Sequence, residues 1–75
     1  MPKPPRITGE QAVTAFERAG FCVIRISGSH HIMKKDGHPK RLSIPVHKGR
    51  NIGTGLLSSQ IDAAGMTREE FYALL

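Results

Sequence analysis

The sequence contains a single cysteine, Cys22, and therefore has no second thiol for an internal disulfide. Small secreted domains are usually held together by several disulfides, so one cysteine among 75 residues predicts a cytoplasmic protein. Because Cys22 lies within an apolar run, we expect it to be a small buried hydrophobic side chain. We also expect no secretory leader, since residues 1–6 are followed by no apolar stretch.

The chain also lacks any apolar run that approaches the length of a membrane span, so we expect no membrane partner. Its 75 residues are enough for a single domain that covers 1–75. A domain this small buries a modest fraction of its surface and has little room for a deep active site. A shallow surface site or a simple binding module is therefore expected.

Acidic residues are scarce, with six against eleven basic ones and a formal net charge of +5. The positive charge is concentrated in 25–50, where Asp36 is the one acid. The basic residues of this segment are Arg25, Lys34, Lys35, Lys40, Arg41, Lys48 and Arg50. An ordinary solvated face is one interpretation of such charge. Its concentration in one segment favours a polyanion or an acidic protein surface as partner.

Helices are predicted at both ends of the chain. Residues 1–7 carry three prolines and are expected to form an extended arm. Thr8–Gln11 has the form of a capping box, and Gly20 is a terminator for the helix that it opens. The apolar stripe of this helix is Ala12, Ala15, Phe16 and Ala19.

A second helix is predicted after Thr54, which we expect to be its cap, and Gly65 ends it with Met66 folding back. Its apolar stripe is Leu57, Ile61 and Ala64. Thr67–Glu70 is another capping box and opens a short last helix. The apolar residues of the last helix are Phe71, Leu74 and Leu75.

Three strands are predicted between the helices, over Phe21–Ile26, His30–Lys35 and Arg41–His47. Pro45 has no backbone donor, so the third strand is expected either to lie at a sheet edge or to donate no hydrogen bond at that position. Alternation then divides the side chains between two faces. The predicted apolar face contains Cys22, Ile24, Ile26, Ile32, Leu42, Ile44 and Val46. The predicted polar face contains Arg25, His31, Met33, Lys35, Arg41, Ser43 and His47. Helices on one face of such a sheet make an α+β layer fold.

Two adjacent histidines, His30 and His31, begin the second predicted strand and must point to opposite faces. Strand alternation places His30 on the apolar face, but its side chain can emerge there because it stands at the end of the sheet. A histidine can act as a general base or acid near neutral pH. RNA cleavage suits such a group, because a base can take the ribose 2′-OH proton and no metal is needed. A structural or partly exposed histidine is the alternative.

The turn before His30 contains Gly28 and Ser29. A glycine lets a phosphate approach the backbone closely, and Ser29 can donate a hydrogen bond to it. A plain hairpin turn is the alternative. His47 precedes the basic loop 48–50 and can contact phosphate or assist His30, or it is simply an exposed polar residue. His38, beside a proline in a turn, is expected to have no role.

The four histidines do not have the spacing of a metal site. No pair has the i, i+4 spacing of helical zinc motifs, and there is no cysteine cluster. We therefore predict no metal and no cofactor.

Three segments, taken in order, resemble the HicA (YcfA-like) family of mRNA interferase toxins: Gly28–Met33, Ile44–Gly49 and Ile52–Met66. Ala19–Phe21 and Thr67–Phe71 are similar too, so the resemblance covers about residues 9 to 71. It implies a double-stranded-RNA-binding-domain-like fold of order α-β-β-β-α, with a three-stranded antiparallel sheet. It further implies a type II toxin that cleaves mRNA and is masked by a HicB-like antitoxin.

The same resemblance implies that His30 is the catalytic residue and that Gly28 belongs to its motif. We expect an RNA- and phosphate-binding set around it. Its members are Gly28, Ser29, Lys34, Lys35, Arg41, His47, Lys48 and Arg50. Two other functions stay open at this point. One is a non-catalytic RNA-binding module of the same fold, and the other is a protein-interaction domain whose basic face docks on an acidic partner.

Overall fold

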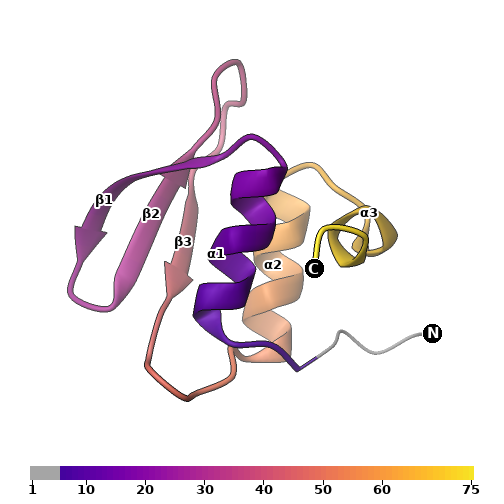
Figure 1. The fold of residues 1–75 in the computed structure, drawn as a ribbon. Coiled ribbons are helices and arrows are strands. Elements are labelled where there is room, and N and C mark those ends of the chain that lie inside the picture. Colours follow the sequence, from indigo (N-terminus) through magenta and orange to yellow (C-terminus); the bar gives the residue numbers. More distant parts are fainter. Residues whose placement is uncertain (1–5) are drawn as a thin grey trace.

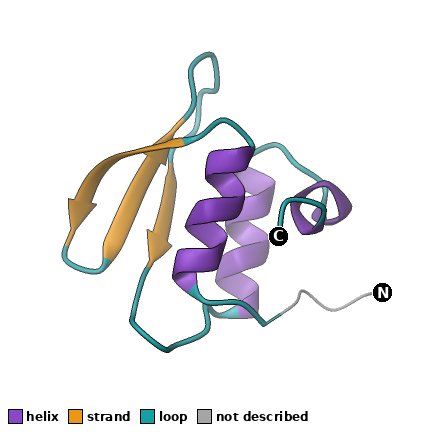
Figure 2. Ribbon diagram, viewed as in Figure 1, coloured by secondary structure: helices purple, strands orange, loops and turns teal. Residues whose placement is uncertain are grey.

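The computed structural model describes residues 6–75, which form two layers (Figure 1). The elements in chain order are α1 (Gly9–Arg18), β1 (Cys22–Ser27), β2 (His30–Lys34), β3 (Leu42–Pro45), α2 (Thr54–Ala63) and α3 (Arg68–Tyr72). The strands form one antiparallel sheet in the order β1-β2-β3, so β3 is an edge strand, as its proline predicts. The helices lie on one side of this sheet (Figure 2). The predicted α+β arrangement is confirmed.

The helix ends follow the local chemistry of the sequence. The Oγ of Thr8 accepts from the N–H of Gln11 at 3.2 Å, and the Oε1 of Gln11 accepts from the N–H of Thr8 at 2.9 Å. Thr67 and Glu70 repeat this reciprocal capping box at α3. Gly20 follows α1 with a φ of 102°, a left-handed conformation that favours glycine. Both predicted capping boxes are confirmed.

The start of α2 differs from the prediction. Gly53 is the N-cap residue and Thr54 is the first helical residue, with no side-chain hydrogen bond at the cap. Thr54 lies one position too late in the chain to cap the helix. The end of α2 agrees with the prediction, because the N–H of Met66 donates to the carbonyl oxygen of Ile61 at 3.2 Å. Met66 thereby folds back onto the core.

The predicted extended arm covers residues 1–7, and the structure describes only the last two of them. Residues 1–5 lie outside the described residues. Ile7 is buried, and its carbonyl oxygen accepts from the N–H of Ile52 at 2.8 Å. Thr8 and Asn51 form an antiparallel bridge beside this bond. The apolar side chain of Ile7 therefore belongs to the core, and its backbone is bonded to the segment before α2.

The start of α1 lies directly against the end of β3 at Gly9. A Cβ atom at this position would overlap the carbonyl oxygen of Pro45 and would lie 3.0 Å from the Cα of Val46. Both are backbone atoms, which have little room to move. A residue without a side chain is therefore required where helix and strand meet.

The register of the strands decides which side chains face the helices. His31 pairs with Ile44 and Met33 pairs with Leu42, and residues directly opposite each other share a face of the sheet. Leu42 and Ile44 are fully buried, as predicted, so His31 and Met33 face the core as well. The prediction that these two residues lie on the polar face is wrong, because pairing with β3 sets the parity of β2.

A β-bulge between Val23 and Arg25 shifts the alternation of β1. Cys22 is exposed, and Ile24 and Ile26 are 50% and 60% exposed, so their predicted burial is wrong. Val23 packs on the core in their place. The bulge breaks the simple alternation, and β1 runs away from α1 along the outer edge of the sheet (Figure 1).

The opposite side of the sheet carries no helix and is called the open face below. Pairing places Arg25 opposite Ile32, and Ile32 opposite Ser43, on this face. The prediction that Ile32 lies on the core face is therefore wrong, whereas Arg25 and Ser43 lie on the face that was predicted for them. The residues of the open face are Cys22, Arg25, Ser27, His30, Ile32, Lys34, Ser43 and Pro45.

The core lies between the sheet and the helices and is centred on three aromatic rings. The rings of Phe16 and Phe71 have centroids 4.8 Å apart, and those of Phe16 and Phe21 are 6.1 Å apart. Phe71 thus docks the short α3 onto the core. Among residues 6–75, no helix is long and apolar enough to cross a membrane.

Candidate nucleic-acid-cleaving site

His30 is the first residue of β2 and is exposed on the open face, between Ser27 on β1 and Pro45 on β3. His30 stands at the end of the sheet, but its side chain lies on the open face and reaches back toward Ser43, whereas the predicted alternation placed it on the apolar face. His31 points to the other face of the sheet. The two adjacent histidines therefore cannot contact the same ligand atom, which is what the sequence predicts.

The ring of His30 is held from the neighbouring strand. Its Nδ1 lies 3.2 Å from the Oγ of Ser43, one step diagonally across the sheet on β3. A ring held through Nδ1 presents Nε2 to a ligand. The sequence predicts Ser43 on the polar face, but no pattern in it assigns Ser43 to the site. The signal that identifies it is the strand register, which pairs His30 with Pro45 and so brings Ser43 within reach.

Ser43 is itself fixed to the helical layer. Its backbone N–H donates to the Oε1 of Gln60 on α2 at 3.0 Å, and both residues are half-buried. This bond satisfies a backbone donor on the free edge of β3, which has no neighbouring strand there. Gln60 could not be predicted, because no short sequence pattern indicates that a side chain on a helix will bond to the edge of a strand.

The turn before His30 is open to solvent. Gly28 has a φ of 59°, and a Cβ built on it would meet no atom within 4 Å. The carbonyl oxygen of Ser29 accepts from the N–H of Val46 at 2.7 Å, which ties this turn to the end of β3. Gly28 and Ser29 therefore lie directly before His30 in the turn, with Gly28 exposed and Ser29 half-buried.

The basic loop after β3 begins at this same end of the sheet. Val46 is bonded to the turn, and His47, Lys48 and Arg50 follow it directly and are exposed. The N–H of Arg50 donates to the carbonyl oxygen of His47 at 3.0 Å, which closes a tight turn. We call this grouping the His30 end of the sheet. Its members are Gly28, Ser29, His30, His47, Lys48 and Arg50.

Three other predicted phosphate ligands lie at the opposite end. Lys34 ends β2 on the open face, and Arg41 precedes β3. At the rise of an ideal strand, the four steps from His30 to Lys34 span about 13 Å. Lys35 follows β2 and places its Nζ 5.7 Å from the ring centroid of Phe21. The structure therefore divides the predicted binding set into two groups at the two ends of one sheet.

His38 has a structural contact that the sequence analysis did not expect. Its Nε2 lies 2.7 Å from the carbonyl oxygen of Ala63, and its ring packs edge-on against Phe21. His31 is half-buried, and its Nδ1 finds no hydrogen-bond partner among the described residues. Neither residue shares the open face with His30. No group of three or more His, Cys, Asp or Glu residues within 6–75 is placed to hold a metal ion.

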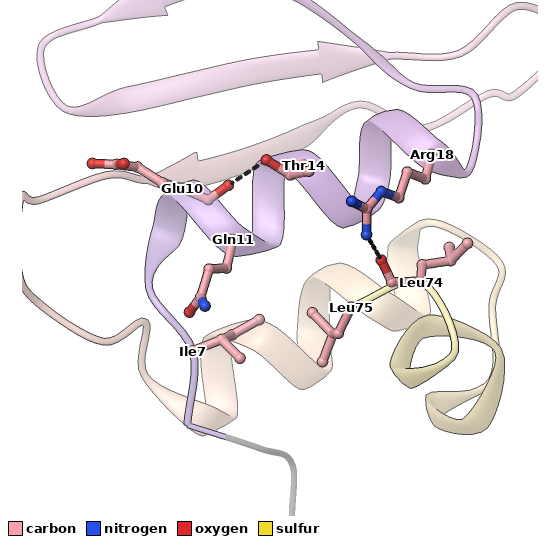
Figure 3. Close-up of a pocket in the computed structure, with 7 residues that line it drawn as sticks. All are labelled: Ile7, Glu10, Gln11, Thr14, Arg18, Leu74 and Leu75. Atoms are coloured by element: carbon pink, nitrogen blue, oxygen red, sulfur yellow. Dashed lines mark hydrogen bonds between the residues drawn. The ribbon is translucent and has the colours of Figure 1, made fainter.

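A pocket lies elsewhere, on the side of α1 that faces away from the sheet (Figure 3). It is lined by Ile7, Glu10, Gln11, Thr14, Arg18, Leu74 and Leu75. The Nη1 of Arg18 donates there to the carbonyl oxygen of Leu74 at 2.7 Å. His30 is not part of this pocket, so the histidine belongs to a shallow surface, as expected for so small a domain.

The fold and the site define a small α+β domain with an exposed histidine and several cations gathered at one end of an open sheet. The family model of the HicA toxin of bacterial toxin–antitoxin systems matches residues 9–66, which include all three strands, α2 and His30. The chain therefore belongs to the HicA toxin family, as the resemblance implies. Membership gives it the role of a toxin with an antitoxin partner. No curated protein sequence matches the chain significantly.

Proposed function

We propose that this toxin is a metal-independent endoribonuclease that cleaves mRNA, with His30 as its catalytic residue. The observation that carries the proposal is the position of His30, which is exposed on the open face and held through Nδ1 by Ser43. A histidine fixed by one nitrogen and accessible at the other is suited to general acid–base catalysis.

The chemistry uses only RNA and this ring. His30 takes the proton of a ribose 2′-OH, and the oxygen attacks the adjacent phosphorus. The bond from phosphorus to the 5′ oxygen of the next nucleotide breaks, and that oxygen leaves with the proton that His30 had taken from the 2′-OH. The products are a 2′,3′-cyclic phosphate and a 5′-hydroxyl, so atoms and charge balance without a metal or a cofactor.

The cations of the His30 end hold the RNA backbone in this proposal. Lys48 and Arg50 neutralise phosphates next to the reacting one, His47 contacts phosphate, and the turn at Gly28–Ser29 admits a phosphate close to the backbone. Lys34 and Arg41 continue the basic surface to the other end of the sheet, and Lys35 follows Lys34 with its Nζ near the ring of Phe21. An RNA strand lying across the open face contacts both groups.

The partner in this proposal is a HicB-like antitoxin of a type II system, which binds the open face in the cytoplasm. Such a partner covers His30 on the open face together with the exposed cations at the His30 end of the sheet. Toxin inhibition then needs no change in the fold.

A non-catalytic RNA-binding module is the second candidate. The shallow surface favours it, because the one side-chain hydrogen bond found for His30 among residues 6–75 is with Ser43, a neutral residue. Such a module binds RNA with a steep salt dependence and leaves it uncut.

The test compares purified wild type with His30→Ala on mRNA, in the presence and absence of EDTA. We expect the wild type to cleave in both conditions and His30→Ala to leave RNA intact while keeping its melting temperature, since His30 is exposed. His38→Phe is the matched control, because it removes a histidine outside the site and should still cleave. Full cleavage by His30→Ala contradicts the proposed catalytic role, and loss of cleavage in EDTA contradicts metal independence.

A wild type that binds RNA but never cuts it establishes the second candidate. Expression in bacteria gives a parallel test. We expect growth arrest and loss of mRNA with the wild type and neither effect with His30→Ala.

A further inference from the structure

Two hydrogen bonds connect His30 to the helical layer of the protein. The first joins its Nδ1 to the Oγ of Ser43, and the second joins the backbone N–H of Ser43 to the Oε1 of Gln60. We propose that Ser43 is the positioning residue of His30, accepting a hydrogen bond from Nδ1–H and so making Nε2 the nitrogen that exchanges a proton with RNA. This inference rests on the proposed function.

The direction of the hydrogen bond between His30 Nδ1 and Ser43 Oγ follows from the proposed role of the ring as a base. A serine hydroxyl can donate or accept, so the geometry alone permits both tautomers of His30. A ring that acts first as a base needs an unprotonated Nε2, and Nδ1 then carries the hydrogen. After Nε2 has taken a proton, both ring nitrogens are donors. The Oγ of Ser43 can therefore accept a hydrogen bond from Nδ1–H both before and after Nε2 takes a proton, without moving.

The structure holds Ser43 firmly enough for this role. Its Cα partner on β2 is Ile32, and its N–H is bonded to α2 on the other side of the strand. Ser43 is therefore held between Leu42 and Ile44, which pair with β2, and is bonded to α2 through its own N–H. Gln60 acts through the backbone of Ser43 and fixes the strand rather than the ring.

A neutral hydroxyl orients the ring without adding a charge beside it. The side-chain hydrogen-bond partner of His30 among residues 6–75 is the Oγ of Ser43, which carries no charge. Ser43 thus selects the tautomer and direction of the ring while leaving it able to release a proton to the departing 5′ oxygen.

The direct test is the tautomer of His30, read from its ring ¹⁵N chemical shifts by long-range ¹H–¹⁵N correlation. In the wild type we expect the Nδ1–H tautomer when the ring is neutral. Ser43→Ala should shift the ring toward the Nε2–H tautomer, whereas Ser43→Thr keeps a hydroxyl at the same carbon and should retain the wild-type spectrum. Ser59→Ala, on an exposed serine of α2, is the control.

Cleavage kinetics give the second measurement. The loss of one orienting hydrogen bond should lower kcat about tenfold in Ser43→Ala and leave KM unchanged within about twofold. Ser43→Thr should recover most of this loss, and Ser59→Ala should match the wild type.

A wild-type ring that is mainly in the Nε2–H form overturns the proposal, even if Ser43→Ala does not fold. Identical tautomers in the wild type and folded Ser43→Ala overturn it as well. If the wild type does not cleave RNA at all, the proposed ribonuclease function fails. The tautomer measurement still decides whether Ser43 orients His30, so the two failures are distinguishable.

Discussion

The imidazole of His38 bonds the β2–β3 loop to the end of α2, with its Nε2 at 2.7 Å from the carbonyl oxygen of Ala63. A carbonyl oxygen only accepts, so Nε2 carries the hydrogen in this bond. The last carbonyls of a helix lack partners within the helix, and His38 supplies one. Its ring also packs edge-on against Phe21, with centroids 5.4 Å apart. The histidine outside the site therefore stabilises the fold.

His38→Phe should lower the free energy of unfolding by about 1 kcal/mol, because the ring stays but the hydrogen bond to Ala63 is lost. Urea denaturation measures this change. RNA cleavage should equal that of the wild type under conditions where both are folded. A variant that is fully stable would show that the bond contributes nothing, and one that is stable but inactive would place His38 in the site.

Gly9 and Gly55 form a matched pair of helical glycines with opposite predicted effects. Gly9→Ala should destabilise the fold by about 1–3 kcal/mol, since its Cβ would overlap the backbone of Pro45 and Val46. Gly55→Ala meets no atom within 4 Å and should stabilise α2 by up to about 1 kcal/mol. Thermal or urea unfolding of both variants checks the pair. Equal effects at the two positions would contradict the close contact between α1 and β3.

Glu70 should make the stability of the fold depend on acid pH. Hydrogen bonds from the backbone and then the side chain of Thr67 lower the pKa of Glu70 below its ordinary value of 4.5. Because the folded pKa is below the unfolded one, the stabilisation is complete above about pH 4.5 and is lost as pH falls through the folded pKa. The wild type should therefore melt above Glu70→Gln at neutral pH, and the difference should shrink in acid.

Glu69→Gln is the control for this measurement, since it removes a neighbouring exposed carboxylate from the same helix. Melting temperatures taken from neutral pH down to about pH 3 compare the three proteins. A gap between the wild type and Glu70→Gln that does not change with pH would show that the capping box owes nothing to the charge of Glu70.

The two groups of cations should contribute to RNA binding through phosphate contacts. In a His30→Ala background, which keeps the RNA intact, Lys48→Ala or Arg50→Ala should weaken binding. Each lost contact should also reduce the slope of log K against log salt by about 0.7 on single-stranded RNA. Arg68→Ala removes the same charge from α3 and should leave the slope unchanged. Filter binding or fluorescence anisotropy at several salt concentrations gives the slopes.

Lys34→Ala and Arg41→Ala extend this test to the other end of the sheet. A loss of slope there shows that RNA crosses the open face from one end to the other. An unchanged slope restricts the binding surface to the His30 end.

Features that depend on neighbours in sequence were predictable, and features that depend on pairing were not. The capping boxes at Thr8 and Thr67 involve residues three apart, so the sequence is enough to identify them. The face of Met33 depends on its partner Leu42, and the exposure of Cys22 depends on the bulge in β1. Neither the partner nor the bulge leaves a local pattern.

The same distinction holds at the site. Gly28, Ser29 and His30 are consecutive, and their common position at the end of the sheet follows from the turn. Ser43 comes 13 residues after His30 and reaches it only through the register of β3. The division of the cations between the two ends of the sheet could not be predicted either. Lys34 and Lys48 both belong to the basic segment 25–50, and only the strand arrangement places them at opposite ends.

The sheet separates two kinds of selective constraint. Its covered face contains Met33, Leu42 and Ile44, where a changed volume costs stability, whereas its open face contains side chains whose replacement costs the fold little. Substitutions can therefore accumulate on the open face without unfolding the domain. A toxin built in this way can diverge from its relatives in the ligands it recognises while the same buried residues continue to specify the fold.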